Sequence, residues 1–204
     1  MNKTGTTSLN KFFLKKGLSA IDDSRWWYES NLQSLECNAW TDGFEGYNRN
    51  LTFPKIKNLK FQFPKAFFIL QTRPLSSWLL SRLRHSEVVE DYFKFAPKDK
   101  DILDHWTIVR NNWHEEVLEE FKEDENFLLL DISQDFKSCL EAFLGLDVSD
   151  DEMNFENYLH GYKSEEREDH LRKKVKNFLE KNIVNEDWDS ITVAKYLKKI
   201  LEVR

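Results

Sequence analysis

The fold is decided by the stretch Ala66-Phe67-Phe68-Ile69-Leu70-Gln71-Thr72-Arg73-Pro74. Residues 66–72 are apolar almost throughout, which predicts a strand that is buried on both faces of a sheet. The strand ends at Arg73, and Pro74 then opens a helix, in the first turn where proline is tolerated. The apolar positions of this helix are Leu75, Trp78, Leu79 and Leu83.

A second buried strand is predicted at residues 127–132, which read Phe-Leu-Leu-Leu-Asp-Ile. A helix over residues 134–144 follows it and ends at Gly145, and a polar helix over about residues 99–122 precedes it. Buried strands that alternate with helices are typical of βαβ units. The sequence therefore predicts an α/β fold with a short parallel sheet flanked by helices.

The N-terminal residues 6–16 predict another helix, because Leu9, Phe12 and Phe13 recur at helical spacing and Gly17 stands where helices commonly end. Further elements are expected in this order: an extended segment at 18–21, a helix at 24–36, a strand at 37–41, and a helix at 44–59 broken near Pro54. The tail is predicted to be helical, with one apolar stripe at Leu171, Val175, Phe178 and Leu179 and another at Val193, Leu197, Ile200 and Leu201.

Composition bounds the class of protein. The chain has 204 residues, among them 16 Phe, 7 Trp and 6 Tyr, which is enough aromatic surface for a core and suits one domain over 1–204. Its formal charge of -6 gives no support to bulk electrostatic binding of nucleic acid. No apolar run approaches the roughly 20 residues of a membrane span, and the N-terminus lacks the apolar core of a signal peptide. We therefore expect a cytoplasmic protein in which Cys37 and Cys139 are reduced, buried thiols.

A candidate anion site stands at Lys3-Thr4-Gly5-Thr6-Thr7-Ser8, directly before the first predicted helix. Glycine lets the backbone approach a ligand closely, and the first amides of a helix lie at the positive end of its dipole. Such a helix end suits phosphate or sulfate, to which Lys3 adds a charge and the hydroxyls add donors. The alternative is an ordinary Ser/Thr helix cap with a lysine nearby.

The order of these residues separates two kinds of phosphate loop. A Walker A loop reads G-x-x-x-x-G-K-S/T, whereas here Lys3 precedes Gly5, so a nucleoside triphosphatase is disfavoured. The order K-T-G-T-T-S-L at residues 3–9 instead resembles the 5′-phosphosulfate loop of the PAPS-dependent sulfotransferases.

A second match to that family lies where the predicted strand 66–72 meets the helix that Pro74 opens. In those sulfotransferases a strand ends in an arginine, a serine follows eight residues later in the next helix, and the pair binds the 3′-phosphate of PAPS. Arg73 and Ser81 stand at that spacing here. The planar guanidinium suits a phosphate bidentately, and ligands bind at the carboxyl ends of strands in open α/β sheets. The alternative is a surface arginine with an incidental helix serine.

The resemblance covers about residues 2–145, and residues 146–204 form a helical C-terminal part without a match. The segment Asn38-Ala39-Trp40-Thr41-Asp42 is similar to the one that precedes the substrate pocket in the K-T-G-T-T-S-L subgroup. The family's Arg-Lys-Gly loop has no clear counterpart. Lys163, Arg167 and Arg172 are either its substitutes or surface charges. The family's phosphate loop also follows a central buried strand, so we expect that first strand to be missing here, because Met1 stands directly before the loop.

The resemblance implies a P-loop-type three-layer sandwich that transfers a sulfuryl group from PAPS to a hydroxyl or amine of a small-molecule or glycan acceptor. It assigns Lys3 to the bridging oxygen between sulfate and 5′-phosphate, and the amides of Gly5 to Thr7 to the 5′-phosphate. Neither role needs a metal, and PAP is the product.

An acceptor hydroxyl also needs a general base within hydrogen-bond reach. Asp42 is the first candidate because it follows a predicted strand in the pocket-forming segment, and Glu45 is the second. Asp42 before Gly43 is also a common turn pair. Five tryptophans either line an acceptor pocket or belong to the core, namely Trp26, Trp27, Trp40, Trp106 and Trp113. The five histidines lack the spacing of metal ligands.

Two other functions stay open at this point. One is a P-loop kinase with a degenerate loop, which would bind ATP in preference to PAP. The other is a non-catalytic PAP(S)-binding or interaction protein derived from a sulfotransferase and disabled by loss of the first strand.

Overall fold

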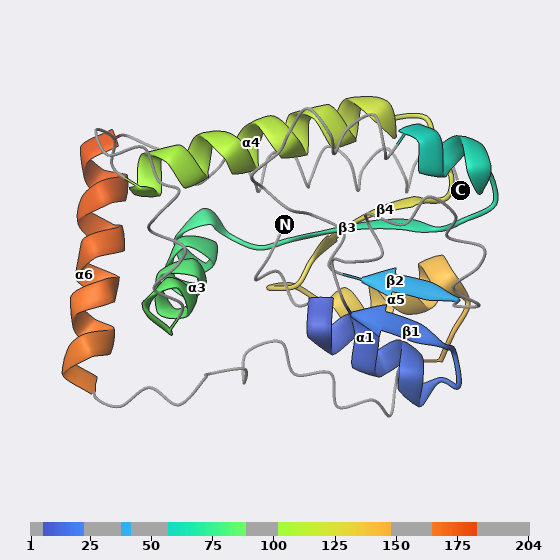
Figure 1. The fold of residues 1–204 in the computed structure, drawn as a ribbon, viewed down its shortest axis with the longest axis horizontal. Helices are drawn as coiled ribbons and strands as arrows, with labels where there is room; N and C mark the ends of the chain where they lie inside the picture. Colours follow the sequence, from blue (N-terminus) through green and yellow to red (C-terminus); the bar gives the residue numbers. More distant parts are fainter. Residues whose placement is uncertain (1–5, 23–37, 42–56, 89–101, 148–164, 183–204) are drawn as a thin grey trace. The chain divides into compact units, whose positions relative to one another are not determined.

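The computed structural model describes residues 6–22, 38–41, 57–88, 102–147 and 165–182, and these form a mixed α/β protein that is mostly helical (Figure 1). Its elements are α1 (Thr6–Lys15), β1 (Ala20–Asp22), β2 (Ala39–Thr41), β3 (Phe68–Thr72), α3 (Leu75–Val88), α4 (Ile102–Glu120), β4 (Phe127–Asp131), α5 (Phe136–Leu144) and α6 (Glu165–Asn182). Residues 57–62 form a short helix before β3.

The chain divides into two compact units and passes from one to the other three times. The first unit comprises Met1–Gln71 and Glu116–Asn157, and the second comprises Thr72–Glu115 and Tyr158–Arg204. Within the described residues, the first unit therefore holds α1, β1, β2, β3 as far as Gln71, the end of α4, β4 and α5. The second holds α3, most of α4, and α6.

Strands β1 and β2 form a parallel pair in the first unit. Ala20 is in register with Ala39, and Asp22 with Thr41. Ser19 and Asn38 are hydrogen-bonded to each other directly before the two strands. The Ser19 carbonyl accepts from the amides of Asn38 and Ala39. The Ser19 amide and hydroxyl both donate to Oδ1 of Asn38. Helix α1 packs on both strands.

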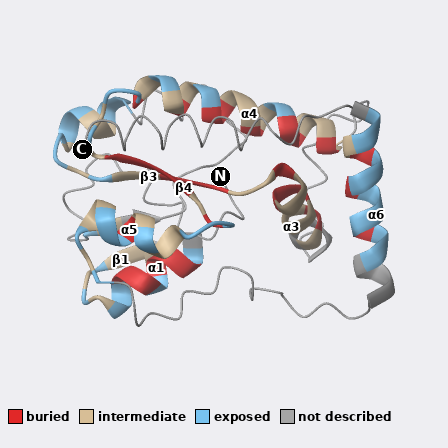
Figure 2. Ribbon diagram, turned by 180° about the vertical axis from the view of Figure 1, so that it is seen from behind, coloured by how far each residue is buried: buried red, intermediate tan, exposed pale blue. Residues whose placement is uncertain are grey.

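Strands β3 and β4 form a second pair. The amide of Phe68, at the start of β3, donates to the carbonyl of Asn126, directly before β4, over 2.8 Å. Because both strands begin at the same end of the ladder, they run parallel. Every residue of β4 before Asp131 is buried, which is the burial expected of a strand covered on both faces (Figure 2).

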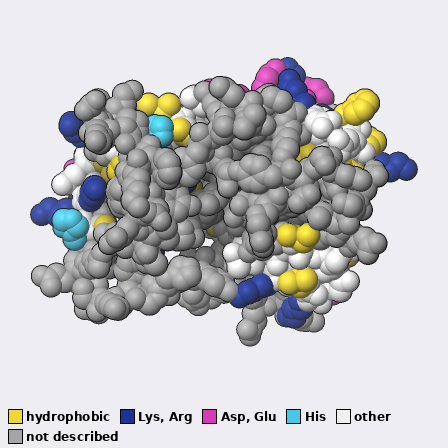
Figure 3. Space-filling model, viewed as in Figure 1, with side chains coloured by type: hydrophobic (Ala, Val, Ile, Leu, Met, Phe, Trp, Pro, Cys, Tyr) yellow, Lys and Arg dark blue, Asp and Glu magenta, His cyan; other side chains and the backbone are white. Residues whose placement is uncertain are grey.

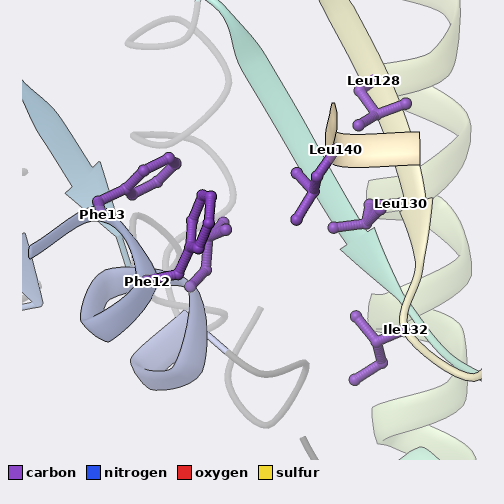
Figure 4. Close-up of a cluster of buried hydrophobic side chains, with 7 residues drawn as sticks. Phe12, Phe13, Leu128, Leu130, Ile132 and Leu140 are labelled. Carbon is purple, nitrogen blue, oxygen red and sulfur yellow. The ribbon is translucent and has the colours of Figure 1, made fainter. Parts of the chain in front are cut away.

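The core of the first unit lies between α1, β4 and α5 (Figure 4). Successive side chains of a strand point to opposite faces, so Leu128 and Leu130 share one face of β4, where they meet Leu140 of α5. On the other face, the ring of Phe127 stacks on that of Phe121, with 4.9 Å between the ring centroids. The core cluster is completed by Leu9, Phe12, Phe13 and Ile132.

Glycines end two helices of the first unit at positive φ. Gly17 (φ 78°) closes α1, where the amide of Leu18 donates to the carbonyl of Phe13. Gly145 (φ 65°) closes α5 and donates its amide to Glu141. This left-handed conformation is unfavourable in free energy for residues with a Cβ, and glycine is therefore common at helix ends.

Helices α3 and α6 pack against each other in the second unit. The buried residues of α6 recur along one face, and exposed residues cover the rest (Figure 2). Those buried residues are Leu171, Val175 and Phe178. Their spacing of four and three places them on one side of a helix, as the sequence predicted.

The structure confirms the α/β class and the order of the predicted elements within the described residues. It differs in the sheet: the four described strands form two separate pairs, not one sheet. Three strands also begin two residues later than expected, and β2, expected from residue 37, begins at Ala39. Strand β1 begins at Ala20 because Leu18 still closes the end of α1, and β3 begins at Phe68 because the Ala66 amide turns back to the Phe63 carbonyl.

Other boundaries moved by a few residues or lie elsewhere. The helix expected to end at residue 59 continues to residue 62, and the polar helix expected over 99–122 spans Ile102–Glu120. The helix expected at 24–36, most of that at 44–59, and the last tail stripe lie outside the described residues.

Candidate functional site

The junction between β3 and α3 carries the two residues that the sequence assigns to the 3′-phosphate. Arg73 directly follows the last residue of β3, and its Nε donates to Oγ of Ser77 over 3.0 Å. The Arg73 side chain therefore turns along the first turns of α3. Ser81 lies four residues after Ser77, and residues four apart share one face of a helix. Arg73 thus contacts the helix face that carries Ser77 and, one turn later, Ser81.

Helix α3 is anchored by its buried apolar residues and by a hydrogen bond at its first turn. The amide of Trp78 donates to the carbonyl of Pro74 over 2.9 Å, so the first helical hydrogen bond begins at the proline. The buried residues of the helix are Leu75, Trp78, Leu79 and Leu83. Because these anchor the helix, Ser77 and Ser81 remain on half-buried positions.

A buried arginine of α4 reaches the same junction. Nη2 of Arg110 donates to the carbonyl oxygen of Arg73 over 2.8 Å and to Oγ1 of Thr72 over 3.3 Å. Its Nη1 donates to Oδ1 of Asn111 over 3.3 Å. Only 1% of the Arg110 surface is exposed, so this charge is solvated by protein oxygens in place of water.

Two arginine–tryptophan contacts join α3 and α4 in a reciprocal way. The guanidinium of Arg82 on α3 lies 4.6 Å from the ring centroid of Trp106 on α4. That of Arg110 on α4 lies 5.6 Å from the ring of Trp78 on α3. Such cation–π contacts contribute about 0.5–2 kcal/mol each. They hold Arg110 at a set position relative to α3.

His114 lies one turn after Arg110 on α4 and is buried. Its Nδ1 is 3.1 Å from the carbonyl oxygen of Arg110. A carbonyl only accepts hydrogen bonds, so the proton of the neutral ring belongs on Nδ1. Nε2 has no hydrogen-bond partner among the residues that the structure describes. Burial, with the charge of Arg110 second, lowers the pKa of His114 well below its usual value, and the ring is neutral at pH 7.

The 5′-phosphosulfate half of the predicted site belongs to the first unit. Helix α1 begins at Thr6, so Thr6, Thr7 and Ser8 form its first turn, close to the helix start that the sequence analysis expected. Thr7 is exposed and Ser8 is buried. Lys3, Thr4 and Gly5 lie outside the described residues. Arg73 and Ser81 belong to the second unit.

Several other candidate residues lie outside the described part of the chain, including both candidate bases, Asp42 and Glu45. Trp106 and Trp113 are buried in the second unit, so of the two alternatives these tryptophans belong to the core. Cys139 is a free, half-buried thiol, and burial, with Asp135 second, raises its pKa. Arg172 is exposed on α6.

Figure 3 shows described Lys and Arg side chains on one face of the molecule, together with described hydrophobic, acidic and histidine side chains. Among the described residues, no group of three His, Cys, Asp or Glu side chains could hold a metal ion. No helix in the described part of the chain is long and apolar enough to cross a membrane.

The sequence reasoning missed Ser77 and Arg110. The signal for Arg110 was present in α4, where buried residues recur at intervals of three and four. They are Leu103, Trp106, Arg110, Trp113 and Val117. An arginine in the middle of such a stripe indicates a buried charge with a polar partner.

Comparison of the chain with protein-family models, with curated proteins and with solved structures finds no match in any of the three.

Proposed function

We propose that the protein is a PAPS-dependent sulfotransferase, which moves a sulfuryl group from PAPS to a hydroxyl or amine of a small-molecule or glycan acceptor. One observation carries the proposal: Arg73 leaves the end of β3 and donates Nε to Ser77, one turn before Ser81 on the same helix face. This arrangement suits an anion near the start of α3, because the Arg73 guanidinium meets the Ser77 hydroxyl there.

The other half of the proposal rests on the loop before α1. The first turn of α1 starts at Thr6, three residues after Lys3, which is the relation that a phosphate-binding loop needs. In the proposed reaction, amides of Gly5 to Thr7 hold the 5′-phosphate. Lys3 neutralises the negative charge that develops on the bridging oxygen when the sulfur–oxygen bond to PAP breaks.

The acceptor oxygen or nitrogen attacks sulfur on the side opposite the leaving PAP, and its proton passes to a base, for which Asp42 is our candidate. By analogy with phosphoryl transfer, the enzyme contributes positioning and charge stabilisation. The proposal includes a P-loop-type three-layer sandwich as the fold, PAPS as co-substrate, no metal in the transfer step, and a cytoplasmic location. The parallel pairs β1–β2 and β3–β4 are compatible with such a sandwich.

The test is a comparison of PAP with ADP by thermal shift. Both nucleotides carry two phosphates, but ADP has no 3′-phosphate. PAP at about 100 times its Kd stabilises the protein by about 2.7 kcal/mol. We expect a clear shift with PAP and a smaller one with ADP, followed by sulfuryl transfer from labelled PAPS to at least one acceptor in pools of phenols, glycans, lipids and peptides.

Equal shifts with the two nucleotides, or none with PAP in a folded sample, would refute the 3′-phosphate site. A larger shift with ATP would favour the kinase. PAP binding without transfer to any acceptor pool would favour the non-catalytic binding protein.

A further inference from the structure

The end of β3 depends on a side chain for part of its backbone hydrogen bonding. Thr72 is the last residue of the strand, and Arg73 lies beyond the regular ladder. Pro74 has no amide hydrogen, which removes no helical hydrogen bond because first-turn amides have no partner within a helix. The carbonyl of Arg73 accepts from a side chain, Nη2 of Arg110, over 2.8 Å.

The side chain of Arg110 is itself well fixed. It is buried, it lies over the ring of Trp78, and it donates to Thr72 and Asn111 as well as to Arg73. A buried ion is not needed for packing, because apolar residues of similar volume often stabilise a core as well or better. What an apolar side chain does not provide is a donor to the carbonyl of Arg73. The role of Arg110 is therefore tied to the backbone of that residue.

We propose that Arg110 is a positioning residue for Arg73: it holds the backbone at the end of β3 so that the Arg73 guanidinium lies along Ser77 and Ser81 and meets the 3′-phosphate of the nucleotide. This inference rests on the proposed function. Two hydrogen bonds then set Arg73, one from Arg110 to its carbonyl and one from its own Nε to Ser77. Arg110 acts through Arg73 and need not touch the nucleotide.

The test uses Arg110→Lys, which keeps the charge and loses the planar fork. The matched control is Arg84→Lys on α3, an arginine with no part in this contact. We expect Arg110→Lys to weaken PAP binding about tenfold and to leave the affinity for adenosine 5′-phosphate, which has no 3′-phosphate, unchanged. In Arg73→Ala, adding Arg110→Lys should cause no further loss of PAP affinity, because the residue through which Arg110 acts is gone.

A merely structural role predicts a different result. Arg110→Lys would then weaken the binding of PAP and of adenosine 5′-phosphate alike, and its effect on PAP affinity would add to that of Arg73→Ala. Either outcome overturns the proposal, as does an affinity for PAP equal to that of the Arg84→Lys control.

A second measurement needs no nucleotide. Amide hydrogen exchange should be faster in Arg110→Lys over residues 70–77 and unchanged over β4 at residues 127–131. Unchanged exchange over 70–77 would overturn the positioning role whatever the chain binds. If the wild-type chain did not bind PAP, the proposed function would fail, and the exchange result alone would decide whether Arg110 holds the end of β3.

Discussion

Nε of Arg73 lies 3.0 Å from Oγ of Ser77, across the first turn of α3. This hydrogen bond directs the guanidinium along the helix face that also carries Ser81. A strand-end arginine would otherwise have several rotamers to choose from, and ordering it in advance reduces the entropy that binding must overcome.

Arg73→Ala should weaken PAP binding by about 1.5–3 kcal/mol, because a charge-assisted hydrogen bond to the 3′-phosphate is lost. That is about a 10- to 100-fold rise in Kd. Titration calorimetry with PAP measures it, and Arg84→Ala serves as the control. A loss of ADP affinity as large as that of PAP would contradict the assignment of Arg73 to the 3′-phosphate.

Lys3→Ala should lower kcat by about 100- to 1000-fold, because the lysine charge is needed where the leaving oxygen becomes negative. It should weaken PAP binding far less. A labelled-PAPS transfer assay and a PAP titration on the same variant provide the two numbers. Lys11→Ala, an exposed lysine of α1, is the control. The division of roles is wrong if turnover simply follows PAP affinity.

Acid should destabilise the protein through His114. Burial first, and Arg110 second, depress the pKa of this ring below the ordinary 6.5, whereas the unfolded chain titrates normally. Below about pH 6.5 the unfolded state binds the extra proton. The His114 contribution to the free energy of unfolding is therefore full above pH 6.5 and falls at lower pH, by at most about 1.4 kcal/mol per pH unit.

Urea unfolding at pH 7.5, 6.5 and 5.5 measures this contribution. His114→Gln should remove most of this pH dependence, while His170→Gln, at an exposed position of α6, should retain it. An identical slope in His114→Gln and wild type would contradict the prediction.

Leu140→Ala should lower the free energy of unfolding by about 2–5 kcal/mol, since the side chain is fully buried (0% exposed) between α5 and β4, and its loss leaves a cavity. Leu14→Ala, at a position of α1 that is 51% exposed, should change it by less than about 0.5 kcal/mol. Chemical denaturation of both variants makes the comparison. Similar effects of the two substitutions would mean that the core is not packed as described.

Gly145→Ala should destabilise the protein by about 1 kcal/mol, because alanine is strained at the positive φ of the α5 terminus. Within the described part of the chain, a Cβ at this position meets no atom within 4 Å, so the backbone conformation is the expected cause. Gly145→Asn should cost less, as asparagine tolerates this conformation. Thermal unfolding distinguishes them, and an alanine variant as stable as wild type would exclude the backbone cause.

The local elements were readable from the sequence because their signals are local. Apolar runs marked β3 and β4, helical spacing of Leu171, Val175 and Phe178 marked α6, and Gly17 and Gly145 marked helix ends. The candidate site was readable in part for the same reason: Arg73 and Ser81 stand at a fixed spacing across a strand–helix junction.

Only the tertiary structure decided which strands pair and where charges are buried. Strand alternation implies parallel pairing, but the separation into pairs β1–β2 and β3–β4 depends on contacts between residues far apart in sequence. Arg110 is the sharpest case. As a charged residue it is expected at the surface, yet it is buried, because its guanidinium meets the carbonyl of Arg73, 37 residues away in the chain, and the ring of Trp78. A hydrogen bond at that separation requires the strand end and α4 to come together, and no local pattern encodes that approach.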